Sequence, residues 1–170
     1  MSTDGNYICT GYERAYIYNI SSQHLFSVNG SKQTCNPSMT PDTQHTGQMM
    51  FLNIGGIQAM DTMPVSMQGV SLKEHKFIFI ADTNNNYINS FNIVDMVPGM
   101  AGASGCEWQC PKWSNVPDFF CALTSPTGLD PWDCYLISIS NSSTTLLKLN
   151  KSSLLSFDGT SKPYVHIGGN

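Results

Sequence analysis

Charged residues are scarce in this 170-residue sequence. Only 12% of its residues are Asp, Glu, Lys or Arg, against about 25% in a typical soluble domain. Ser, Thr, Asn and Gln supply the polarity instead. With eight Lys and Arg residues and a net charge of −4, the sequence has no basic patch of the kind that nucleic acids require. A nucleic acid partner is therefore excluded.

Long apolar runs are also missing. No stretch approaches the roughly 18 consecutive apolar residues that indicate a membrane-spanning helix, so no membrane span is predicted. Residues 1–5 lack the charged and apolar regions of a signal peptide. If the protein is secreted, we expect its leader to have been removed or to lie upstream of this chain.

The familiar signatures of catalysis are absent as well. The sequence has no H-E-x-x-H pattern, nucleophile elbow, P-loop or dinucleotide fingerprint. The four histidines are scattered and are interpreted as surface or interface residues: His24, His45, His75 and His166. No catalytic residue, metal ligand or cofactor is assigned, and an enzyme is not favoured.

Cysteine, in contrast, is plentiful. The six residues are Cys9, Cys35, Cys106, Cys110, Cys121 and Cys134, and four of them crowd into residues 106–134. Their spacing lacks the paired C-x2-C of a zinc site, which favours disulfides, although many pairings remain open. Cys9 is expected in a strand and Cys35 in an insertion.

Four N-glycosylation sequons accompany the cysteines. Their acceptor residues are Asn19, Asn29, Asn141 and Asn150. Sequons belong on the surface loops of secreted proteins, and disulfides persist in oxidising compartments. Together they predict an extracellular or cell-surface glycoprotein.

A β-hairpin pattern occurs three times. Residues 76–93 hold two short apolar runs separated by Ala-Asp-Thr-Asn-Asn-Asn, a polar cluster that reverses the chain between two strands. Residues 6–19 and 135–150 repeat the pattern. No amphipathic helical window appears, so the chain is predicted to be nearly all β, in meanders of about four short strands.

Residues 69–92, GVSLKEHKFIFIADTNNNYINSFN, resemble the NHL repeat, whose pattern runs roughly G-I-A-V-D, G-N-I-Y-V-A-D and N-x-R-I-x-x-F. Residues 4–8 are similar to its G-N-I-Y part, residues 126–129 to its entry, and residues 51–56 to its fourth-strand ending. Tyr87 stands where the family usually has Arg. Residues 30–48 and 97–120 have no counterpart and are interpreted as long insertions.

The resemblance implies an all-β, propeller-type array of four-stranded antiparallel blades, at about 4–57, 64–121 and 122–170 within a single domain. Because propellers need about four or more blades to close, three would form an incomplete ring. We therefore expect a fragment of a longer polypeptide, or self-association into an oligomer or filament.

Two segments have alternative interpretations. Asp82, Asn84 and Asn85 are expected to stabilise the hairpin turn through bonds to their own backbone, although their oxygens also suit calcium. The loop at 105–121 carries Trp108, Trp113, Phe119 and Phe120 between cysteines. These aromatic residues form either a local core or a partner-contact surface.

The function predicted from these observations is an extracellular structural or interaction module that binds a protein or glycan partner or assembles with itself. The alternative is part of a metal-dependent six-bladed propeller hydrolase or lyase, since several propellers of similar architecture are such enzymes. No ligand cluster in the sequence favours this alternative.

Overall fold

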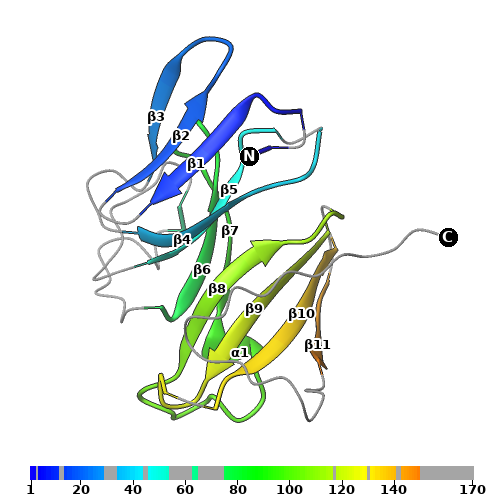
Figure 1. Ribbon diagram of the computed structural model, residues 1–170. Coiled ribbons are helices and arrows are strands. Elements are labelled where there is room, and N and C mark those ends of the chain that lie inside the picture. Colours follow the sequence, from blue (N-terminus) through cyan, green and yellow to red (C-terminus); the bar gives the residue numbers. More distant parts are fainter. Residues whose placement is uncertain are drawn as a thin grey trace, which may run out of the picture.

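The computed structural model describes residues 1–2, 4–11, 14–28, 34–43, 46–53, 63–64, 75–116, 118–129, 131–140 and 143–149. In these residues the chain is all β apart from one short helix, and its strands form three antiparallel sheets (Figure 1). The all-β prediction is therefore confirmed. Each sheet is a meander, because consecutive strands are hydrogen-bonded neighbours.

The first sheet contains β1 (Tyr7–Gly11), β2 (Ala15–Asn19) and β3 (His24–Val28). The middle sheet contains β4 (Thr34–Met39), β5 (Met49–Asn53), β6 (Phe77–Ala81) and β7 (Tyr87–Asn92). The helix α1 (Ile93–Met96) follows β7. The last sheet contains β8 (Glu107–Trp113), β9 (Phe119–Ser125), β10 (Asp133–Ser140) and β11 (Ser143–Leu149).

All three expected hairpins are present, as β1–β2, β6–β7 and β10–β11. In the middle one, the Asp82 carboxylate accepts hydrogen bonds from the backbone N–H groups of Asn84 and Asn86 at 2.8 and 2.9 Å. It also accepts one from the Asn86 side chain at 2.9 Å. Asn85 has a positive φ of 61°, which Asn tolerates better than most residues. The structural interpretation of this turn is therefore confirmed.

The inner strands β5 and β6 of the middle sheet are buried on both faces, because the middle sheet lies between the other two (Figure 1). Successive side chains of a strand point to opposite faces. On β5, Met49 and Phe51 pack against the first sheet, whereas Met50 and Leu52 pack against the last sheet. The run of apolar residues in β5 is thus the pattern of a strand that is covered on both sides.

The core between the middle and last sheets is built around aromatic side chains. Phe120 and Trp108 are fully buried, and the rings of Phe91 and Phe120 lie 5.1 Å apart. The indole Nε1 of Trp108 donates a hydrogen bond to the Phe91 carbonyl at 3.1 Å, so the buried polar atom is satisfied.

The strands β4 and β8 each contain a β-bulge. In β4 the register with β5 shifts between Cys35 and Ser38, and in β8 the register with β9 shifts between Gln109 and Lys112. In each case one extra residue is accommodated, as in a β-bulge. A proline lies inside each shift, at Pro37 and Pro111, where a missing N–H does not break the ladder.

These two strands correct the sequence interpretation. Residues 34–39 and 107–113 were expected in long insertions, and Cys35 in one of them, yet they form β4 and β8. Proline and the bulges interrupt the period-two alternation by which strands are recognised. The sheets consequently divide the chain differently from the expected blades, because β4 and β5 pair with β6 and β7.

The entry segment at 126–129 is likewise a loop between β9 and β10, not a strand. The side-chain hydroxyls of Ser125 and Thr127 hold it by accepting hydrogen bonds from backbone N–H groups. Residues 69–72, at the start of the NHL-like segment, and 54–56, at the end of the expected fourth strand, lie outside the described residues.

Candidate functional site

The first strands of the three sheets meet side by side. β1 lies against β4, and β4 lies against β8. Asn36 contacts Gln109, Pro37 contacts Lys112 and Ser38 contacts Trp113. Because these contacts advance in the same direction along both chains, β4 and β8 run parallel to each other.

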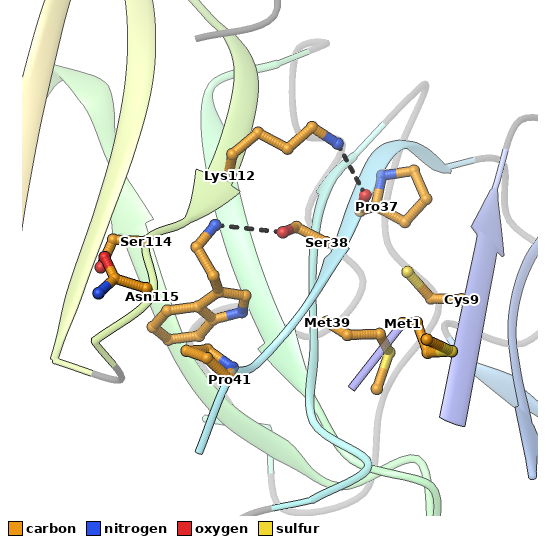
Figure 2. A pocket seen from close by; sticks show the side chains of 10 residues that line it. Met1, Cys9, Pro37, Ser38, Met39, Pro41, Lys112, Ser114 and Asn115 are labelled. Atoms are coloured by element: carbon orange, nitrogen blue, oxygen red, sulfur yellow. Dashed lines mark hydrogen bonds between the residues drawn. The ribbon is translucent and has the colours of Figure 1, made fainter. Parts of the chain in front are cut away.

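A cleft of about 550 Å³ opens where these strands meet (Figure 2). It is lined by Met1, Cys9, Pro37, Ser38, Met39, Pro41, Lys112, Trp113, Ser114 and Asn115. These residues come mainly from β1, β4 and β8 and from the segments that follow the last two. The lining mixes apolar and polar side chains, and binding sites commonly combine apolar walls with a few convergent polar groups.

Two hydrogen bonds fix the wall between β4 and β8 (Figure 2). The ammonium of Lys112 donates to the Pro37 carbonyl at 3.0 Å. The backbone N–H of Trp113 donates to the Ser38 hydroxyl at 3.1 Å. Lys112 has three N–H donors, and it is the only charged side chain among the ten lining residues. The electrostatic character of the cleft is therefore positive.

The Trp113 indole provides the most unusual polar atom of the cleft. Trp113 is only 5% exposed, and its Nε1 has no hydrogen-bond partner among the described residues. Leaving a buried donor unsatisfied costs about 1–3 kcal/mol. A ligand with an acceptor atom would remove that cost.

The Cys9 thiol lies in the same cleft. Burial raises the pKa of the Cys9 thiol above its ordinary value of 9.0. The thiol is therefore neutral near neutral pH and contributes an apolar, polarisable surface rather than a nucleophile.

The six cysteines predicted to form disulfides are all thiols in the structure. Cys121 and Cys134 lie on the neighbouring strands β9 and β10, and both belong to one buried cluster with Leu123 and Trp132. Cys35 and Cys110 lie in the bulged regions of β4 and β8, and Cys106 is buried just before β8. Disulfide formation stays a prediction.

The aromatic residues of the expected 105–121 loop need a correction. Trp108, Trp113 and Phe120 are buried, at 0%, 5% and 0% exposure, and only Phe119 is partly exposed. They fill the core between the middle and last sheets because the segment forms strands and not a loop. Most of these side chains therefore form core rather than an exposed contact surface, and Trp113 also lines the cleft.

Of the four glycosylation candidates, the structure describes Asn19 alone. It ends β2, and its side-chain oxygen accepts a hydrogen bond from the Ser22 N–H at 2.9 Å. Asn29, Asn141 and Asn150 lie outside the described residues.

The sequence interpretation missed Ser38 and Lys112 of the cleft, and it treated His75 as isolated. The signal that could have revealed the cleft is the pair of X-Pro steps, Asn36-Pro37 and Cys110-Pro111, in two segments of unassigned structure. His75 carries no local signal, since its partners Cys35 and Gln109 are distant in the sequence.

No group of three or more His, Cys, Asp or Glu side chains in the described ranges is arranged to hold a metal ion. Within the same ranges, no helix has the length and apolar character needed to cross a bilayer.

Comparisons of this chain with protein-family models, curated proteins and solved structures found no match.

Proposed function

We propose that this chain is an extracellular interaction module of propeller-type blades, and that its cleft binds a carboxylate-bearing segment of a protein partner. The observation that carries this proposal is the buried Trp113 Nε1, which lacks a partner among the described residues and belongs to a wall of the cleft.

The chemistry of the cleft favours an acceptor-rich ligand. Lys112 keeps N–H donors beyond the one that it gives to Pro37, and Trp113 offers its indole N–H. The Ser38 hydroxyl accepts from the Trp113 backbone and retains its own hydrogen to donate. Three donors, one of them charged, suit a carboxylate, because hydrogen bonds between ionised groups are short and strong.

The arrangement of the sheets supports the propeller interpretation. In a propeller, meandering sheets pack face to face and their first strands surround a central channel. Here the middle sheet packs against both neighbours, and β1, β4 and β8 lie side by side around the cleft. The NHL-like segment at 69–92 contributes β6 and β7 to the middle sheet.

The outer face of the first sheet supports assembly with a second copy. Ile8 pairs with Tyr18, and Tyr18 pairs with Leu25, so the three side chains form a row across one face. They are 43%, 36% and 52% exposed. In an array of stacked sheets, this is the face against which a further blade would pack.

The extracellular assignment rests on the six cysteines and four sequons. Among the possible disulfides, the adjacency of Cys121 and Cys134 on β9 and β10 favours that pairing. A metal-dependent hydrolase has no observation in its favour in the described part of the chain.

Selection of displayed random peptides on the purified chain tests the cleft. We expect the selected peptides to carry Asp, Glu or a free C-terminal carboxylate. Trp113→Phe keeps the ring but removes the N–H, and Lys112→Met removes the charge but keeps much of the apolar stem. Each should weaken peptide binding about tenfold or more, since each removes a hydrogen bond to a charged group.

Lys148→Met is the matched control, because Lys148 lies on β11 and pairs with Asp133, outside the cleft lining. It should leave binding unchanged. Peptides without acidic enrichment, or binding that is insensitive to both cleft variants, would contradict the proposal. Selective binding of neutral oligosaccharides with the same dependence on Trp113 would assign the cleft to a glycan instead.

A further inference from the structure

The Cys35 thiol and the His75 imidazole lie within contact distance at the edge of the middle sheet. The sulfur of Cys35 is 3.1 Å from Nε2 of His75. Cys35 belongs to β4, whereas His75 precedes β6 and is tied to β8 through the hydrogen bond from the Trp108 N–H to its carbonyl. Both side chains are partly exposed, so a small reagent can reach them.

The other nitrogen of the His75 ring is also engaged. Nδ1 lies 3.0 Å from Nε2 of Gln109 and 3.5 Å from a carboxylate oxygen of Glu107. A nucleophile beside a base, with the base held by a third group, is the arrangement that activates cysteine in thiol chemistry. The imidazole beside Cys35 is placed to take the proton of the thiol and so generate the thiolate that attacks.

Backbone strain gathers around the same network. His75, Asn36 and Cys110 have positive φ values of 54°, 51° and 47°. Residues held in such conformations typically cost about 1–3 kcal/mol each and cluster at functional sites. The three strained residues are connected. Asn36 donates a hydrogen bond to Gln109 at 3.3 Å, Gln109 contacts His75, and Asn36 contacts Cys110.

A second thiol, that of Cys110, is linked to Cys35 through Asn36. The side-chain amide of Asn36 contacts both sulfurs. Its Nδ2 lies 3.6 Å from Sγ of Cys35, and its Oδ1 lies 4.0 Å from Sγ of Cys110. Cys110 is buried at 4% exposure, so it is shielded from large reagents, and it touches the same Asn36 side chain as Cys35 does.

We propose that Cys35, activated by His75, is the attacking thiol of a thiol–disulfide exchange site, and that Cys110 is its resolving thiol. The substrate class is an accessible disulfide, either of a small molecule or of a partner protein. This site is separate from the cleft, whose lining includes none of Cys35, His75 or Cys110.

The exchange proceeds in two balanced steps. The Cys35 thiolate attacks one sulfur of the disulfide R–S–S–R, so that the bond Cys35–S–S–R forms and the original S–S bond breaks. The departing thiolate takes the proton from Nε2 of His75. Cys110 then gives its proton to the neutral His75 and attacks Sγ of Cys35. The Cys35–Cys110 disulfide forms, the Cys35–S–S–R bond breaks, and the departing thiolate takes that proton from His75 and leaves as the second thiol. The protein dithiol loses two electrons, and the substrate disulfide gains them.

The other cysteines provide an internal contrast. Burial raises the pKa of Cys134 to about 11 and raises the pKa of Cys9. Neither has a histidine contact in the described structure. These thiols should therefore remain protonated and slow to react in the folded protein.

Competitive alkylation of the reduced, folded chain with iodoacetamide, followed by peptide mapping, tests the first step. At pH about 6.5 we expect Cys35 to react about tenfold or more faster than Cys9, because an ordinary thiol is only about one per cent ionised there. His75→Asn removes the imidazole, and Asn tolerates the positive φ. It should reduce the rate at Cys35 to that of Cys9.

Reaction with oxidised glutathione tests the second step. The reduced wild-type chain should end as the Cys35–Cys110 disulfide and release both glutathiones. Cys110→Ala should stop at a mixed disulfide on Cys35, and Cys134→Ala should behave like the wild type. Equal alkylation of Cys35 and Cys9 in the wild type would overturn the proposal, and this measurement depends on no variant. A persistent mixed disulfide on Cys35 in the wild type would show that Cys110 is not the resolving thiol.

Discussion

Asn36 and Cys110 occupy equivalent places in two different sheets. Both have a positive φ, 51° and 47°, and each is followed by proline. Each lies within the register shift of the first strand of its sheet. The two strands lie side by side, and the side chains of Asn36 and Cys110 contact each other. This repeated bulge shapes the junction at which the cleft and the thiol network are built.

Because Cys110 has a positive φ, replacing it with a β-branched residue should destabilise the fold more than the same replacement at another buried cysteine. Under reducing conditions, Cys110→Val should lower the free energy of unfolding about 1–2 kcal/mol more than Cys121→Val does, because the left-handed conformation penalises a side chain that is branched at Cβ. Cys121 is equally a buried cysteine, but it lies in β9 and has no positive φ. Urea denaturation of both variants checks this, and equal losses would contradict the conformational argument.

The contact between the middle and last sheets predicts a large cavity effect. The ring of Phe120 is fully buried and lies near the rings of Phe91 and Trp113. Phe120→Ala should lower the free energy of unfolding by about 3–5 kcal/mol. Leu147→Ala, at a side chain that is 58% exposed, should change it far less. Thermal and urea denaturation give both values, and similar losses would argue against close packing of the two sheets.

Local patterns were enough to predict the hairpins. The strands β6 and β7 are short apolar runs on either side of a turn in which Asp82 binds its own backbone, and each of these features is local in sequence. The same reasoning failed for β4 and β8. There, Pro37 and Pro111 stand inside strands, and the bulges that admit them depend on pairing with β5 and β9.

The candidate sites depend on contacts between distant parts of the chain. Cys35 meets His75, and Lys112 meets Pro37, only after the sheets have packed. Composition could identify six cysteines and a tryptophan-rich segment, but not which side chains are buried. Trp108 and Phe120 were therefore interpreted as residues of a loop, although they lie in the core.

Truncating the Asp82 side chain should lower the stability of the fold. Asp82→Ala removes the acceptor of three hydrogen bonds and should lower the free energy of unfolding by about 1–3 kcal/mol. Asp82→Asn should cost less, because its remaining carbonyl oxygen can still accept from both backbone N–H groups. Urea denaturation with and without calcium checks both interpretations. A rise in wild-type stability on adding calcium, lost in Asp82→Ala, would favour the calcium site.

The Cys134 thiol predicts a loss of stability in alkali. Burial raises the pKa of Cys134 from 9.0 to about 11, so the thiol ionises more readily in the unfolded chain than in the folded one. Its contribution to stability is complete below pH 9 and is lost as the pH rises toward 11. The melting temperature of the reduced protein should fall over this range, and less steeply in Cys134→Ala. Identical slopes for the two proteins would contradict the assignment to Cys134.

The exposed row on the first sheet predicts self-association. Ile8, Tyr18 and Leu25 lie across one face of β1, β2 and β3 and would be covered by a sheet from a second copy. Light scattering should show the purified chain as a dimer or larger assembly. Tyr18→Lys places a charge at the centre of the row and should shift the assembly toward the monomer, because an unpaired charge opposes burial. Leu129→Lys makes a comparable change at a loop side chain that is 70% exposed and should have no effect. A stable monomer of 18.7 kDa for the wild-type chain would refute assembly through this face, and equal dissociation by both variants would show that added charge, rather than the row, is responsible.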